Sequence, residues 1–223
     1  MKQQIVISEA LKAAWKSLKE QIWILVGLLV GYTIIYFLLN IFTPTNEVGA
    51  PKGITGGVMY FVSFAFTTLF YLGYIKNLFQ ALDGEEPQFS AYGQQSGKIL
   101  KGMITSILYS LIMVIGLCLL IIPGIYLGLR LQFAFYFIVE ENTGILDSLK
   151  KSWAITKGQV FPLFLLLLVG IGIVILGIIA LGIGVFVAIP LIFMASCYVF
   201  RKLNAPSASI LEEEGTFLAK AEN

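Results

Sequence analysis

Residues 160–200 form a run of 41 amino acids without a charged side chain, and this run constrains the fold more than any other feature. A membrane-spanning helix needs about 20 mostly apolar residues, so the run is too long for one span and fits two, at 160–180 and 184–200. Four further apolar runs lie upstream, at 21–42, 58–76, 100–121 and 125–139. Backbone polar groups in lipid must be satisfied internally, which favours helices. The sequence therefore predicts an all-α integral membrane protein with six transmembrane helices.

The composition argues against catalysis and against a nucleic-acid partner. Only 13% of the 223 residues are charged, compared with about 25% in soluble domains, and the net charge is +2. Histidine is absent, and Cys118 and Cys197 lie inside apolar runs, where packing explains them. We therefore predict that the chain is not an enzyme and that it binds no cofactor, metal or nucleic acid.

The basic residues indicate the orientation of the spans. Lys and Arg are enriched in the cytoplasmic flanks of membrane proteins. If the N-terminus is cytoplasmic, 13 of the 15 basic residues fall on that side: Lys2, Lys12, Lys16, Lys19, Lys76, Lys98, Lys101, Lys150, Lys151, Lys157, Arg201, Lys202 and Lys220. We expect both termini to be cytoplasmic, with residues 1–203 forming one membrane domain and 204–223 a polar, flexible tail.

Two segments that precede spans resemble each other. Residues 11–23 and 149–161 share Leu, Lys, Trp, Lys and Gln at a fixed offset of 138. Their apolar and basic stripes predict amphipathic helices at the inner surface, at 5–20 and 145–158, with a weaker third candidate at 87–102. The chain then consists of three units, each a surface helix and a hairpin of two spans in the same orientation. Alternatively, the likeness only reflects that lysine-flanked span starts look alike.

These surface helices supply most of the candidate lipid-contacting or anchoring residues: Lys12, Trp15, Lys16, Lys19, Lys150, Lys151, Trp153 and Lys157. Each basic residue near an anionic membrane surface contributes about 1 kcal/mol. A specific lipid role and simple anchoring are both open. Glu140 and Glu141 are interpreted as the inner boundary of a span, and the acids of residues 83–86 as a solvated loop.

Arg130 is the remaining candidate. Pro123 and Gly124 predict a helix break before the fourth span, and Arg130 follows Gly124 by six residues, about 9 Å at ~1.5 Å per residue. We therefore expect Arg130 in the outer half of the membrane, with its side chain turned outward. Its expected partner is Glu47, the carbonyl groups at the break or a lipid phosphate. Arg130 is then either a packing and depth anchor or part of a phospholipid headgroup site.

The segment "LLIIPGIYLGLRLQFAFYFIVEENTGILDSLKKSWAITKGQ" resembles the six-span bacterial membrane domain that occurs fused to glycerophosphodiester phosphodiesterases and in free-standing inner-membrane proteins. The matching residues are Ile121–Tyr126, Arg130 and Leu149–Gly158, whereas Ser148 stands where alanine is usual. The resemblance implies the membrane domain without the enzyme, because the spans use up the chain. It also implies location in the bacterial cytoplasmic membrane.

We therefore expect a non-enzymatic membrane protein that binds lipid, or acts as a scaffold or in membrane homeostasis, at the inner leaflet. The expected partners are membrane lipids with anionic headgroups, and a second membrane protein or further copies of the chain. The alternative is a small-solute or lipid transporter. Proton or sodium coupling is not expected, because the spans contain one arginine and no acid.

Overall fold

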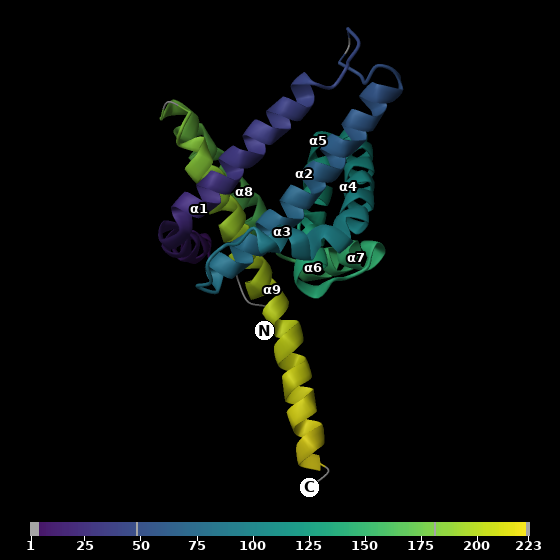
Figure 1. Ribbon diagram of the computed structural model, residues 1–223. Coiled ribbons are helices and arrows are strands. Elements are labelled where there is room, and N and C mark those ends of the chain that lie inside the picture. Colours follow the sequence, from purple (N-terminus) through teal and green to yellow (C-terminus); the bar gives the residue numbers. More distant parts are fainter. Residues whose placement is uncertain (1–4, 48, 181, 222–223) are drawn as a thin grey trace.

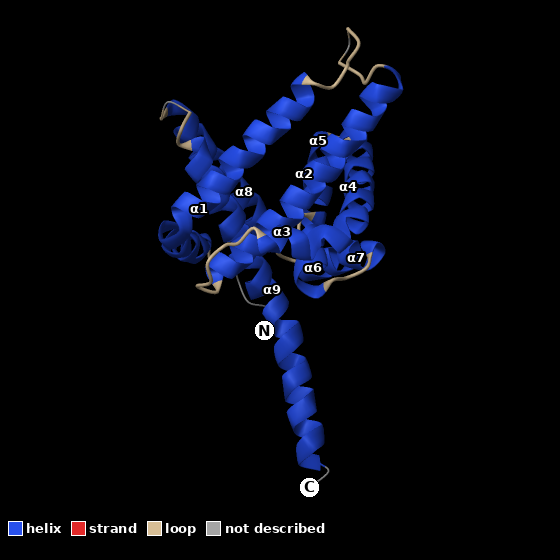
Figure 2. Cartoon of the chain, in the orientation of Figure 1, coloured by secondary structure: helices blue, strands red, loops and turns tan. Residues whose placement is uncertain are grey.

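The computed structural model describes residues 5–47, 49–180 and 182–221, and the regular elements in these ranges are all helical (Figure 2). They are α1 (Ile7–Ile41), α2 (Gly53–Leu82), α3 (Ser90–Gln95), the 3₁₀ turn η1 (Ser96–Lys98), α4 (Ile99–Leu119), α5 (Ile121–Leu131), α6 (Ala134–Glu141), α7 (Ile145–Ile155), α8 (Val160–Ile179) and α9 (Val185–Ala221). Six helical segments are long and apolar enough to cross a membrane: α1, α2, α3 with α4, α5 with α6, α8, and α9 as far as Ala205. The prediction of an all-α, multi-pass membrane protein is confirmed.

The spans form three hairpins whose tips lie toward the same end of the bundle (Figure 1). We call this the tip end; there α1 is followed by α2, α4 by α5, and α8 by α9. The opposite end, the base end, carries α3, α6, α7 and the first turns of α1. The short helices α3 and α7 lie across the ends of the spans (Figure 1).

The backbone turns at two corresponding glutamines. Helix α1 contains one non-helical residue, Gln21, with φ −122° and ψ 16°. Gln159, which directly precedes α8, has nearly the same dihedral angles, φ −113° and ψ 8°. The turn at Gln21 falls at the predicted boundary between the surface helix 5–20 and the first span. Each predicted surface helix therefore ends in a backbone turn just before a span begins.

The fourth span differs from its prediction in two ways. The break lies at the extended residue Leu120, and Pro123 and Gly124 lie in the first turn of α5, so the prediction that these two residues form the break is wrong. Proline is tolerated there because the first N–H groups of a helix have no acceptor within it. The span is also divided into α5 and α6 at Gln132 and Phe133.

The last helix is longer than predicted. Helix α9 continues to Ala221 and projects from the base end of the bundle (Figure 1), so residues 204–221 prolong a span where a separate tail was expected. Alanine and glutamate, which favour helices, are frequent in this segment. Residues 222–223 of the predicted tail lie outside the described residues.

Aromatic side chains join three helices near the base end. The Phe200 ring of α9 lies 5.8 Å from that of Phe79 of α2 and 4.9 Å from that of Phe137 of α6, between centroids. All three side chains are almost completely buried. This cluster fixes α2, α6 and α9 relative to one another near the base end. The charged groups described below lie on or next to these same helices.

Candidate functional site

A lateral groove of about 260 Å³ lies between α1 and α2 and is closed at the base end by α3. Its lining is apolar or aromatic: Gly27, Leu28, Gly31, Tyr32, Ile35, Phe66, Leu69, Phe70, Phe89 and Tyr92. Both long walls belong to candidate spans. The groove therefore offers hydrocarbon-compatible surface at the depth of the membrane.

Stacked aromatic rings from α1, α2 and α3 line the groove. The centroids of Tyr32 and Phe70 are 4.1 Å apart, and those of Phe70 and Tyr92 are 5.6 Å apart. Tyr92 packs so closely on α2 that a Cβ on Gly73 would lie 2.2 Å from its ring. In contrast, a Cβ on Gly27 or Gly31 would meet no atom within 4 Å, so these two glycines leave space open on the α1 side.

A second feature is the junction at which α7 packs against the bend between α5 and α6. The Ser152 hydroxyl donates to the carbonyl oxygen of Arg130 (2.9 Å) and accepts from the backbone N–H of Phe133 (3.1 Å). The Thr156 hydroxyl lies 3.1 Å from the same Arg130 carbonyl oxygen. Buried backbone groups need partners, and Ser152 supplies both where the helix is interrupted; the Thr156 hydroxyl is closer to the Ser152 carbonyl oxygen, at 2.7 Å.

Arg130 and two aromatic residues complete this junction. The guanidinium carbon lies 4.1 Å from the centroid of the Trp153 ring and 5.8 Å from that of Tyr126. The two rings meet edge to face, at 83° with centroids 6.0 Å apart. Arg130 is only 3% exposed, whereas Trp153 and Tyr126 are about 40% exposed. We call Tyr126, Arg130, Ser152, Trp153 and Thr156 the α5–α7 junction.

Of the three partners predicted for Arg130, Glu47 and the carbonyl groups at the break are wrong, whereas the lipid phosphate stays a prediction. Its guanidinium faces Trp153 of α7, at the base end, and within the described residues no ion pair joins it to Glu47 or to another acid. The carbonyl group of Leu120, at the break, accepts from the N–H of Gly124. The prediction assumed a straight span from which the Arg130 side chain extends toward the outer surface. In the structure the span bends, and α7 packs against the last turn of α5.

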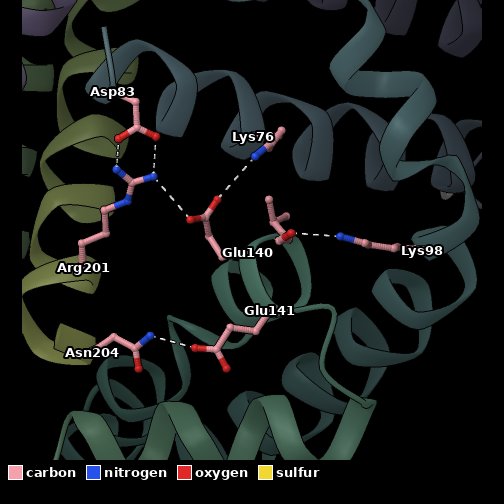
Figure 3. Close-up of polar contacts among 8 residues, drawn as sticks. Lys76, Asp83, Lys98, Glu140, Glu141, Arg201 and Asn204 are labelled. Carbon is pink, nitrogen blue, oxygen red and sulfur yellow. Dashed lines mark hydrogen bonds and ion pairs between the residues drawn. The ribbon is translucent and has the colours of Figure 1, made fainter. Parts of the chain in front are cut away.

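Charged side chains at the base end form a third feature (Figure 3). Arg201 of α9 binds both carboxylate oxygens of Asp83, which follows α2, and lies 3.4 Å from Glu140 of α6. Glu140 also lies 3.8 Å from Lys76. The network therefore links α2, α6 and α9 next to the aromatic cluster that these helices share, since Arg201 also contacts the Phe79 ring.

Arg201 changes the acidity of its partner. Its hydrogen bonds to the Asp83 carboxylate lower the pKa of that group, and its positive charge acts in the same direction. Nearby, Glu141 binds Lys151 of α7 (2.5 Å) and Asn204 of α9 (2.7 Å). The sequence predicts that these acids mark a span boundary and a solvated loop. In the structure Asp83, Glu140 and Glu141 form ion pairs. The side chains of Glu85 and Glu86 are exposed.

The structure brings only some of the predicted lipid-contacting residues together. Trp153 meets Arg130, and Lys19 lies over the Trp15 ring at 6.0 Å. Lys151 is paired with Glu141. The exposed side chains Lys12, Lys16, Lys150 and Lys157 are spread over the first turns of α1, over α7 and over the turn after α7.

Sequence reasoning missed the groove and the two hydroxyl groups of the junction. Gly27 and Gly31 have the spacing of a helix-packing pair, yet they border open space. Ser152 and Thr156 lie inside the segment that carries the family resemblance, which was the available signal for them.

The comparisons with known proteins find relatives and a family whose descriptions give no function. The chain is 26% identical over 152 residues to uncharacterised proteins of Mycobacterium tuberculosis (Rv2560) and Mycobacterium bovis (Mb2590), which covers 68% of this chain and 46% of each relative. The chain thus spans about half the length of the curated relatives it matches. No solved structure matches it. The family described as "Domain of unknown function (DUF7847)" matches residues 91–214, more than half of the chain and the whole of the α5–α7 junction. The chain therefore belongs to the DUF7847 family.

Proposed function

We propose that this protein is a non-enzymatic, lipid-binding protein of the bacterial cytoplasmic membrane, with a scaffolding or homeostatic role at the inner leaflet. The observation that carries the proposal is the groove between α1 and α2, and its occupant is one hydrocarbon chain of a membrane lipid. The lining contains no charged side chain. Its volume of about 260 Å³ is slightly below the ~300–1,000 Å³ of sites for drug-sized ligands, which suits a single chain. Because it opens sideways between two spans, the groove favours lipid binding over transport.

Three further observations support parts of this proposal. The basic residues of α1 and α7 favour a cytoplasmic base end. The matching backbone turns at Gln21 and Gln159 support the internal repeat. The resemblance to the membrane domain of glycerophosphodiester phosphodiesterases is also consistent with a role among lipids, and the segment that carries it forms the α5–α7 junction.

The test fills the groove and counts retained lipids. In Gly31→Leu the new side chain enters the groove without meeting an atom near its Cβ. Gly172→Leu is a matched control, because a Cβ at this glycine of α8 also meets nothing within 4 Å and the residue does not line the groove. We expect native mass spectrometry to show one fewer retained lipid for Gly31→Leu and an unchanged number for Gly172→Leu. Equal retention by both variants would refute the groove as the lipid site.

A further inference from the structure

Arg130 is a buried cation whose charge the described part of the chain does not neutralise. It is 3% exposed, and each of the five ion pairs found there involves other residues. The nearby acids Glu140 and Glu141 are bound to Lys76, Arg201 and Lys151. A buried charge without a counter-ion is costly, particularly inside a membrane. Arg130 therefore needs an explanation beyond packing.

The Trp153 and Tyr126 rings contact only the face of the guanidinium group. A cation over an indole ring is stabilised electrostatically, but the N–H groups of arginine point outward in the plane of the group and need acceptors. The Nε atom of Arg130 is buried and has no hydrogen-bond partner. The donor edge of the guanidinium is thus incompletely satisfied.

The position of this donor edge is fixed. The carbonyl oxygen of Arg130 accepts from Ser152 and lies within hydrogen-bonding distance of Thr156, which ties the last turn of α5 to α7. Trp153 and Tyr126 hold the guanidinium between rings that are themselves partly exposed. The guanidinium is itself buried, so a ligand reaches it only when the partly exposed Trp153 and Tyr126 side chains move aside, while the backbone stays in place.

We propose that the α5–α7 junction is a phosphate-binding site, in which the guanidinium of Arg130 holds one phosphate group and Trp153 forms the adjoining wall. Arginine suits this role because its planar fork binds two phosphate oxygens at once. The phosphate belongs either to an anionic phospholipid or to a soluble phosphate compound. The first source rests on the proposed lipid-binding function, and the second does not.

Trp153 itself reports on occupancy. The chain contains three tryptophans, so Trp15→Phe and Trp23→Phe leave Trp153 as the single probe. The purified protein in dodecyl maltoside is titrated with dioleoyl phosphatidylglycerol, with dioleoyl phosphatidylcholine and with inorganic phosphate. We expect a saturable change in Trp153 emission, with half-saturation at a phosphatidylglycerol concentration about tenfold or more below that of phosphatidylcholine. The same change with inorganic phosphate would support the site with a soluble source.

Three variants in this background make the test decisive. Arg130→Met removes the charge and the donors and should abolish the response. Arg130→Lys keeps the charge but loses the fork, and should raise the half-saturating concentration several-fold. Lys52→Met, the control, removes an equal charge from an exposed lysine at the tip end and should behave as the parent does. No response to phosphatidylglycerol or to inorganic phosphate, or a parental response in Arg130→Met, would overturn the proposal.

The failures of the two proposals are distinguishable. Loss of a retained lipid in Gly31→Leu concerns the hydrocarbon groove and does not depend on the headgroup. The Arg130 titration measures headgroup selection at a different place on the molecule. A protein whose groove binds lipid but whose Trp153 emission responds neither to phosphatidylglycerol nor to inorganic phosphate would retain the proposed function and refute the phosphate site.

Discussion

The hydroxyl group of Ser152 serves two backbone groups that belong to two different helices. It accepts from the N–H of Phe133, at the start of α6, and donates to the carbonyl group of Arg130, near the end of α5. Ser152 is completely buried. Thr156, just after α7, places its hydroxyl 3.1 Å from the same Arg130 carbonyl oxygen. The chain can therefore bend within a span because a side chain from another helix replaces the missing helical bonds.

Ser152→Ala tests this role at the scale of one atom. The substitution leaves the Phe133 N–H without its partner, and such a buried unsatisfied group costs about 1–3 kcal/mol. We expect a lower melting temperature in detergent, with the helix content of the folded protein unchanged by circular dichroism. The control is Ser96→Ala, which removes an exposed hydroxyl bound only to the carbonyl of Gly93. A melting temperature equal to that of the control would show that the bend does not depend on Ser152.

At the scale of elements, the ion pairs at the base end connect helices that are distant in the sequence. Asp83 and Arg201 are 118 residues apart, and their contact joins the end of α2 to α9. Lys202 and Glu9 similarly join α9 to the first turns of α1. These contacts join charged groups, so their contribution to stability depends on pH. The aromatic cluster has no charged group, so its contribution does not.

The Asp83–Arg201 pair predicts a specific dependence of stability on pH. The pKa of Asp83 is lowered in the folded protein, so the pair stabilises the fold above the ordinary aspartate pKa of about 3.9. This contribution is lost as the pH falls through the lowered value. Because both side chains are partly exposed, we expect at most about 1 kcal/mol. Melting temperatures of the wild type and Asp83→Asn should differ at pH 7 and converge below pH 4.

Glu85→Gln serves as the control for this measurement. Glu85 lies in the same loop, its side chain is exposed, and the ion pairs described above do not include it. Its melting curve should follow that of the wild type across the pH range. A difference between wild type and Asp83→Asn that does not shrink as the pH falls below the ordinary aspartate pKa would contradict the assignment.

The spans were predictable from the sequence because the membrane fixes their length and apolar character. The bend between α5 and α6 was not, since Gln132 and Phe133 include neither proline nor glycine. What sets the bend is the contact with hydroxyl groups 19–26 residues further along the chain. The environment of Arg130 was missed for the same reason, because its partner Trp153 becomes a neighbour only after the chain has bent.

The glycines show the same limit. The spacing of Gly27 and Gly31 is the same whether the glycines face another helix or open space, so a sequence cannot distinguish packing from a groove. By contrast, the resemblance of residues 119–159 to a known membrane domain selected the segment that forms the α5–α7 junction.

At the scale of the whole molecule, the two ends of the bundle differ in chemistry. The tip end holds the connections of the three hairpins, whereas the base end holds the ion pairs, α3 and α7. The positive-inside rule then predicts that the base end is cytoplasmic. We expect a cysteine at Glu86 to be protected from a membrane-impermeant maleimide in intact cells, and a cysteine at Glu47 to be labelled.

Glu47 and Glu86 suit this experiment because both side chains are exposed and lie in loops at opposite ends. Gln95, although in the same segment between α2 and α4, is only 3% exposed and would report burial instead of sidedness. The background should carry Cys118→Ser, since Cys118 is exposed and Cys197 is buried. Labelling at Glu86 without labelling at Glu47 would invert the topology.

The hydroxyl bridge at the α5–α7 junction also has a consequence for biosynthesis. When the fourth span has left the ribosome but α7 has not, the span lies in the membrane region without the serine and threonine that contact its backbone at the bend. Unsatisfied backbone groups in lipid each cost several kcal/mol, so a nascent chain arrested at such a length should retain this span poorly. Arrest at a length that places residues up to Gly158 outside the ribosome supplies both hydroxyls. Glycosylation mapping of arrested chains in microsomes should therefore show the fourth span becoming stably inserted only after α7 has emerged.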